Sequence, residues 1–241
     1  MIEAAINKIL ALAQPEILSV GGCNYSSKVM LPVKDPVPAP IVVGTLTGLI
    51  DYIKANRDEI DFDKCIIHIE NYSGVTLISK LRGNFVERDT YVDVLDYHNE
   101  HNFGTYLDIE NFIVWLQANF LDAGDRAKIL AFVGNIQDGQ IANFSDDGVT
   151  QSVNVKTGIT KVEVAPVPNP VSLTPYRTFI DAVQPASDFV FRMRSGGGSD
   201  RPTVALFEAD GGKWKSDAVQ NIKTYLVDEL ARIQADIPVI A

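Results

Sequence analysis

Apolar residues recur at helical spacing at the start of the chain, and the pattern stops at Pro15. The residues that form this apolar stripe are Ile2, Ile6, Ile9, Leu10 and Ala13. We expect an amphipathic helix here rather than a signal peptide, because Glu3 precedes the apolar run and Lys8 lies inside it.

Helical periodicity returns in four further segments: residues 45–60, 107–122, 126–136 and the C-terminal stretch that begins at Ser216. Thr45 is placed to cap the first of them and Asp108 the second, because both side chains offer an oxygen to free backbone N–H groups. Gly134 is the expected end of the third, since glycine commonly terminates helices.

Short runs rich in Val, Ile and Tyr predict strands in both halves of the chain. Residues 65–70, 74–81 and 90–98 are separated by turn-forming residues, so we expect three consecutive antiparallel strands. In the second half, residues 149–164 alternate around a Lys-Thr-Gly turn and predict a hairpin. A second hairpin is expected from residues 188–194 and 202–208, and a short apolar strand ends the chain.

Proline-rich stretches divide these elements. Residues 33–43 contain three prolines, which exclude a helix and indicate a connector or an edge segment. We therefore expect an N-terminal helix and connector over residues 1–44, an α+β region over 45–136, and a β-rich region with a C-terminal helix over 137–241, which can be continuous with the second.

Strands grouped with strands, and helices at the margins, favour the α+β class over a parallel doubly wound sheet. The predicted architecture has mostly antiparallel sheets, with amphipathic helices at the N-terminus, in the middle and at the C-terminus.

The composition excludes several kinds of protein. The 241 residues are 46% hydrophobic, which is enough for a sizeable core, and the formal net charge of −10 disfavours nonspecific binding to DNA or RNA. No run of apolar residues is long enough to cross a membrane. The two cysteines, Cys23 and Cys65, are far apart in the sequence, which indicates a reducing compartment such as the cytoplasm.

Five segments carry a family resemblance. In order, they are TLTGLIDYIKAN, YVDVLDYH, TYLDIENFIVWLQANFLD, VPNPVSLTPY and FVFRMR. Together they resemble the YfdQ-like family of unknown function from tailed phages and prophages, with VLDYH as the most specific point and with the first forty residues not covered. The resemblance implies a phage or prophage origin and an accessory role in the host cytoplasm, leaves association with the virion open, and transfers no catalytic residues.

The stretch VLDYHNEHNFG holds the candidate catalytic residues Asp96, His98 and His101. On a strand, Asp96 and His98 would be neighbours on one face, so that the carboxylate could fix the imidazole tautomer as a general base requires. No nucleophile motif accompanies them, and a zinc site needs three or four ligands, so no metal or other cofactor is predicted. The structural alternative, which we favour, is that Asp96 and His98 tie the strand end to the next turn.

Arg192, Arg194 and Arg201 form the clearest basic cluster in an acidic protein. Arg192 and Arg194 alternate along a predicted strand and therefore share a face, where they could bind a small anion or an acidic partner surface. The SGGGSDR loop between the hairpin strands resembles a phosphate cradle but lacks the features of a P-loop. A solvated sheet face and a flexible loop are the alternatives.

Two smaller features complete the candidates. Asp146 and Asp147 could bind a cation, but a solvated turn is the commoner origin of such a pair. Trp115 falls in a predicted apolar helix stripe, which indicates a core residue. Trp214 precedes the last helix and is predicted to be exposed, with packing at the helix entry as the alternative.

Three functions remain open from the sequence. The favoured one is a non-enzymatic phage accessory protein that forms homo-oligomers or binds a host or phage protein. The second is a binder of a small anionic ligand, such as a nucleotide signal used in host defence. The third is an enzyme that uses the histidines, with or without a metal.

Overall fold

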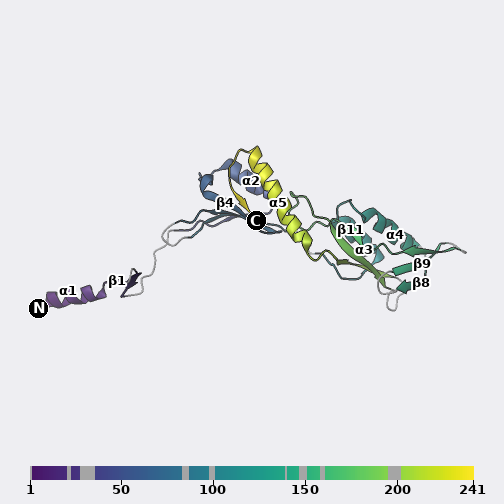
Figure 1. Ribbon diagram of the computed structural model, residues 1–241, viewed down its shortest axis with the longest axis horizontal. Helices are drawn as coiled ribbons and strands as arrows, with labels where there is room; N and C mark the ends of the chain where they lie inside the picture. The colour runs from purple at the N-terminus through teal and green to yellow at the C-terminus, as the bar shows by residue number, and fades with distance from the viewer. Residues whose placement is uncertain are drawn as a thin grey trace. The chain divides into compact units, whose positions relative to one another are not determined.

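The computed structural model of the chain describes residues 2–20, 23–27, 36–82, 87–97, 101–138, 140–146, 151–157, 161–194 and 202–241. The chain divides into two compact units, Met1–Val37 and Pro38–Ala241 (Figure 1). Each unit has its own helices and strands.

The N-terminal unit consists of one helix and one hairpin. Helix α1 spans Ile2–Ala13 and confirms the predicted amphipathic helix. Strands β1 (Ile17–Val20) and β2 (Cys23–Ser26) form an antiparallel pair that the sequence pattern did not predict. The backbone N–H of Ser27 donates to the carbonyl of Glu16 at 2.9 Å and closes the open end of this hairpin.

A five-stranded sheet forms one half of the second unit. Its strands, in spatial order, are β14 (Val239–Ile240), β4 (Cys65–Asn71), β5 (Gly74–Ser79), β6 (Thr90–Leu95) and β3 (Ile41–Val43). The three central strands pair antiparallel, as predicted, whereas both edge strands pair in parallel with their neighbours. The stretch after the prolines thus becomes an edge strand.

Helices α2 (Leu46–Ala55) and α5 (Lys213–Arg232) cover one face of this sheet, and a short 3-10 turn, η1 (Phe62–Lys64), precedes β4. The backbone N–H of Gly48 donates to Thr45 Oγ1, which confirms the predicted cap. Helix α2 ends before the predicted residue 60 because Asn56 adopts a left-handed conformation and exchanges side-chain hydrogen bonds with the backbone of Ile60.

A four-stranded sheet and two helices form the other half. The strands, in spatial order, are β11 (Val171–Leu173), β12 (Ser187–Arg194), β13 (Thr203–Glu208) and β7 (Leu107–Asp108). Helices α3 (Ile109–Asn119) and α4 (Arg126–Asp138) bury one face, with Phe112 and Leu116 fully buried. Asp108 accepts the N–H of Asn111 and caps α3, as predicted.

The remaining strands form a three-stranded antiparallel sheet in the order β10 (Lys161–Pro166), β9 (Gln151–Thr157) and β8 (Gln140–Asp146). The predicted hairpin is confirmed as β9 and β10. Strand β8 was not predicted, and it contains Asp146, which was expected in a turn; Asp147 lies outside the described residues. The prediction that Gly134 ends its helix is wrong, because α4 continues to Asp138.

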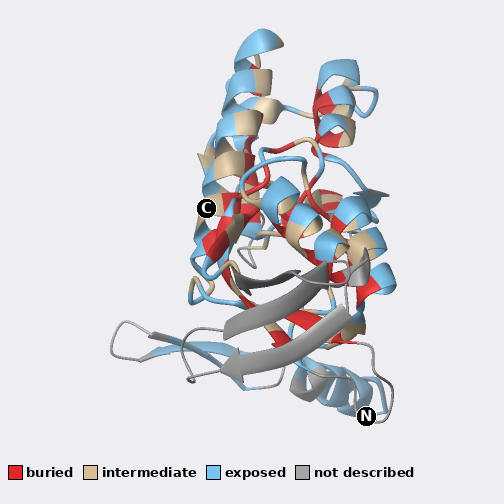
Figure 2. Ribbon diagram, turned by 90° about the vertical axis from the view of Figure 1, so that its right-hand side faces the viewer, coloured by how far each residue is buried: buried red, intermediate tan, exposed pale blue. Residues whose placement is uncertain are grey.

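The fold class predicted from the sequence is confirmed. The chain is α+β, its sheets are mostly antiparallel, and helices lie near the N-terminus, in the middle and near the C-terminus. Buried residues concentrate where helices meet the two larger sheets (Figure 2). Within the described part of the chain, no helix has both the length and the apolar character that a membrane span requires.

Candidate functional site

Asp96 lies directly after strand β6, where it connects the strand to a neighbouring turn. Its backbone N–H donates to the carbonyl of Ser73 at 2.9 Å, and its side chain is half-buried. The predicted alternation of the strand is confirmed up to this point, since Val92 and Val94 are buried. His98 lies outside the described residues, so its pairing with Asp96 stays a prediction.

His101 packs among aromatic rings. Its ring stacks on Phe103 with centroids 5.0 Å apart and meets Trp115 and Phe120 edge-on or tilted. Its Nε2 lies 2.7 Å from the carbonyl oxygen of Tyr176, which ties this cluster to a later segment of the chain. Among the described residues, no three His, Cys, Asp or Glu side chains are grouped closely enough to hold a metal ion. The ring contacts and the Tyr176 carbonyl anchor His101 between two segments of the chain.

Cys65 is not an activated nucleophile. It is buried on β4, and burial, with a smaller effect of Asp61, raises the pKa of its thiol to about 11. A thiol with such a pKa stays protonated at neutral pH and is a poor nucleophile.

Arg192 and Arg194 share the outer face of β12, as predicted from their alternation. The inward residues of this strand are buried, whereas Arg192 is half-buried and Arg194 is exposed. Arg194 lies over the ring of Tyr106, with 3.4 Å from its guanidinium carbon to the ring centroid. Arg201 and the glycine-rich loop lie outside the described residues.

Arg177 is the most deeply buried charged residue in the described part of the chain, and it was not predicted from the sequence. Its side chain is only 2% exposed, yet it carries a guanidinium that must be satisfied inside the protein. It donates to Glu208 Oε1 at 2.7 Å and to Ser187 Oγ, and its guanidinium carbon lies 4.0 Å from the ring centroid of Trp214. Burial lowers the pKa of Arg177, while the carboxylates of Glu208 and Asp210 oppose this shift. The sequence around it, LTPYRTF, gives no periodic signal that would mark a buried arginine.

The Arg177 network extends to the start of helix α5 through Asp210. Ser187 Oγ donates to Asp210 Oδ2 at 2.6 Å, and the same carboxylate accepts the N–H groups of Gly212 and Trp214. Trp214 is therefore buried beneath Arg177, and the prediction that it is exposed is wrong. Trp115 is partly buried against the core of its half, in line with its predicted position.

Neighbouring residues of the same segment contact the other half of the unit. Thr178 Oγ1 donates to the carbonyl of Tyr72 in the β4–β5 turn. The Asp181 carboxylate accepts the N–H of Leu46 at 3.0 Å and the hydroxyl of Thr47, which caps helix α2. The Arg177 network thus belongs to a segment that joins the two cores, which is a structural role.

Asp210 gives this network a pH dependence. Burial raises the pKa of Asp210, but hydrogen bonds from Ser187, Gly212 and Trp214, with the charge of Arg177, outweigh burial and hold the pKa below the ordinary value of 3.8. A lowered folded-state pKa adds stability that is present above the unfolded pKa and is lost as pH falls through the folded one.

We expect Asp210→Asn to lower the free energy of unfolding at pH 7 by about 1–2 kcal/mol, because it weakens a cap and a charge-assisted hydrogen bond. The difference from the wild-type protein should shrink as pH falls from 3.8 through the lowered folded-state pKa, because Asp210 itself then becomes protonated. Urea unfolding at pH 7 and pH 3 measures both values, and a difference that stays constant with pH would contradict the assigned role of the charge.

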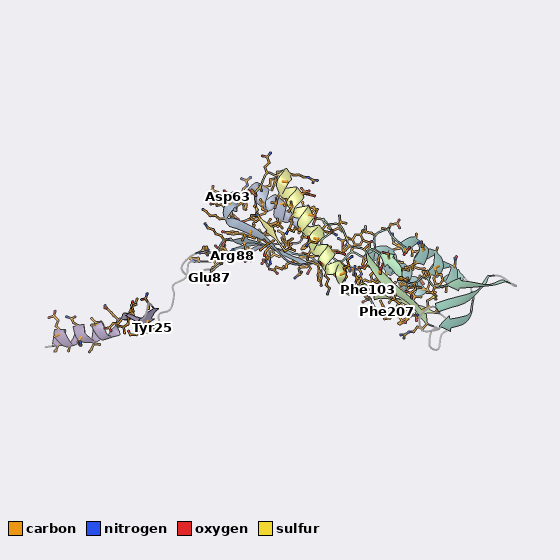
Figure 3. All side chains as sticks on the ribbon, in the orientation of Figure 1. Tyr25, Asp63, Glu87, Arg88, Phe103 and Phe207 are labelled. Atoms are coloured by element: carbon orange, nitrogen blue, oxygen red, sulfur yellow. The ribbon has the colours of Figure 1, made fainter. Side chains whose placement is uncertain are left out.

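The N-terminal unit presents a different kind of candidate surface. Seven large apolar side chains of α1 and the hairpin are between 50% and 80% exposed, and Tyr25 extends from β2 (Figure 3). These residues are Ile2, Ile6, Ile9, Leu10, Ile17, Leu18 and Tyr25, and we call them the apolar arm surface. None of the described side chains in this unit is buried, so these residues form no core.

Fold and site together define an α+β protein with a buried structural arginine, a basic strand face and an apolar N-terminal unit. Comparison of the chain with protein-family models, with curated proteins and with solved structures found no match. The resemblance to the YfdQ-like family therefore stays a prediction.

Proposed function

We propose that this chain is a non-enzymatic accessory protein of a phage or prophage that acts by self-assembly through its N-terminal unit. The observation that carries the proposal is the apolar arm surface, which is large for a unit of this size and has no core beneath it among the described residues. The phage setting rests on the family resemblance of the segments from about Val43 onward.

The N-terminal unit is too small to be stable by itself. A single helix of 12 residues is marginal in water, and so is an isolated two-stranded hairpin. Folded units below about 40 residues usually depend on disulfides, metals or oligomerisation. Residues 1–37 contain one cysteine, Cys23, so no disulfide can close within the unit. They contain no histidine, so a metal site of cysteine and histidine ligands has only one ligand there. Association with another protein surface is the route that remains well supported.

A second copy of the chain is the partner that the charges and spacing favour. Residues 1–37 contain three acidic and three basic residues, so the unit is neutral and the formal charge of −10 lies in Pro38–Ala241. A neutral N-terminal unit meets no net electrostatic repulsion from the same unit of a second copy. Ile2, Ile6 and Ile9 follow the spacing of four and three by which helices pack against one another.

Changing Ile6 and Ile9 together to serine should dissociate the assembly. Burying an isoleucine side chain contributes about 1.5–3 kcal/mol, so two losses weaken association by about 3–6 kcal/mol, or roughly a hundredfold to ten-thousandfold. Light scattering coupled to size-exclusion chromatography on the full chain measures the mass over a range of concentrations. The wild-type protein should be oligomeric and the variant monomeric. The thermal unfolding transition of the second unit should be the same in both proteins.

Val183→Ser is the matched control, because Val183 is an apolar residue of the second unit that is even more exposed than Ile6 and Ile9. Its mass should equal that of the wild-type protein. A wild-type protein that stays monomeric at every concentration would overturn the proposal. If the α1 amides of such a monomer are protected from hydrogen exchange, the N-terminal unit packs against its own chain instead.

A further inference from the structure

The outer face of the four-stranded sheet combines arginine and aromatic side chains. Strand register places Val190 opposite Phe207, Arg192 opposite Ala205 and Arg194 opposite Thr203, and opposed residues of an antiparallel pair lie on the same face. Tyr106 directly precedes β7, and its ring meets that of Phe207 with centroids 6.1 Å apart. We call the four residues Tyr106, Arg192, Arg194 and Phe207 the basic–aromatic face.

Arg194 packs over an aromatic ring of this face. Because β13 lies between β12 and β7, the side chain crosses β13 to reach the Tyr106 ring, 3.4 Å from its guanidinium carbon. Ala205, which lies in the row beneath, is 1% exposed. A guanidinium that packs over an aromatic ring loses less conformational freedom when it binds an anion.

Phe207 supplies a half-buried aromatic ring beside the two arginines. Its neighbour on the side of β7 is Gly104, whose α-carbon carries no side chain to cover the ring; an added Cβ would lie 3.6 Å from the Phe207 ring. Gly104 therefore packs closely against one edge of the ring, and the part of the half-buried ring that stays exposed can meet a flat ligand. Stacking of a base on an aromatic ring contributes to affinity whatever the base.

We propose that the basic–aromatic face binds a free nucleotide, with the phosphates on Arg192 and Arg194 and the base against Phe207. The α-carbons of the two arginines are about 7 Å apart along the strand. Both long side chains can therefore reach one di- or triphosphate. A polyanion such as single-stranded nucleic acid suits the protein less well, because the net charge of −10 repels it. This binding is independent of the assembly through the N-terminal unit.

Titration calorimetry of the full chain with ATP, inorganic triphosphate and a single-stranded oligothymidylate tests the assignment. ATP should bind saturably and at least about tenfold more tightly than inorganic triphosphate, which has no base to stack. Absence of saturable ATP binding, or equal affinity for the two, would overturn the proposal. Tighter binding of the oligonucleotide than of ATP would overturn the choice of a free nucleotide.

Two variants assign the contacts separately. Arg194→Gln should weaken ATP and triphosphate alike by about tenfold or more, since it removes a charge-assisted contact to phosphate. Phe207→Leu should weaken ATP about fivefold or more and leave triphosphate unchanged. Arg232→Gln, a change at an exposed arginine of α5, is the control and should alter neither. The proposal is wrong if Arg194→Gln and Phe207→Leu both leave the ATP affinity unchanged while their thermal transitions match that of the wild-type protein.

Discussion

Replacing Arg177 with methionine is expected to lower the free energy of unfolding by about 3 kcal/mol or more, since removing one partner of a buried ion pair leaves the other groups uncompensated. Methionine keeps much of the apolar stem and its packing, so the loss reports on the guanidinium. Ser187 and Glu208 would lose their donor, and Trp214 would lose the cation above its ring.

The expected size follows from where the charge lies. Glu208 is 39% exposed on its side chain and can be rehydrated, which limits the cost of losing its partner. Ser187 is buried, so water cannot replace the hydrogen bond that it loses, although it still donates to Asp210. A protein of this kind is stable by about 5–15 kcal/mol in total, so a loss of about 3 kcal/mol is a large share of it.

Arg232→Met provides the matched comparison. Arg232 also pairs with a glutamate, Glu229, but its side chain is 72% exposed. Exposed ion pairs contribute about 0–1 kcal/mol, so this variant should unfold almost like the wild-type protein. Equal losses in the two variants, measured by urea unfolding at pH 7, would show that burial of Arg177 does not set its contribution.

Local patterns were enough to predict most of the architecture. In the five-stranded sheet, the alternation of Val92 and Val94 with polar residues identified a strand that is buried on one side. In helix α3, Asp108 and the spacing of Phe112 and Leu116 marked both the start and the buried face. These features depend on residues close together in the sequence, which is why a single sequence reveals them.

Features that depend on distant residues could not be predicted in the same way. Strand β14 pairs with β4, and Arg177 finds Glu208 and Ser187 only after the chain has folded. Composition gave no sign of either contact. Trp214 shows the same limit, because its neighbours at the start of α5 are polar, yet its ring is covered by Arg177 from another segment.

The candidate site was predicted in part. Alternation placed Arg192 and Arg194 on one face, and the structure has them there. It could not supply Tyr106, which lies more than eighty positions earlier and meets Arg194 only through the sheet. The histidine hypothesis relied on neighbours in sequence, whereas His101 contacts aromatic rings and a carbonyl from a distant segment.

Glycine positions illustrate how far local rules reach. Gly134 was predicted to end a helix, but α4 runs past it, because its buried residues Val133 and Ile136 keep the helix packed against the core. No sequence pattern marks Gly124 as a special position. Its role depends on the chain segment at Ser172, which no local pattern connects to it.

Gly124→Ala is expected to lower the free energy of unfolding by about 2–5 kcal/mol, the sum of a left-handed backbone penalty and steric overpacking. Gly124 has φ of +62°, and an added Cβ would lie 2.4 Å from the carbonyl oxygen of Ser172. That carbonyl cannot easily move away, because it accepts the N–H of Asp125 at 2.9 Å while the Asp125 carboxylate accepts the N–H of Ser172.

Gly134→Ala is the opposite case and should stabilise the protein by about 0.5–1 kcal/mol, because alanine favours a helix interior over glycine. Gly134 lies inside α4, and nothing is within 4 Å of where the added Cβ would lie. Thermal unfolding followed by circular dichroism should therefore move in opposite directions for the two variants. A neutral Gly124→Ala would mean that the segment at Ser172 can shift, and that the hydrogen bonds to Asp125 do not hold it in place.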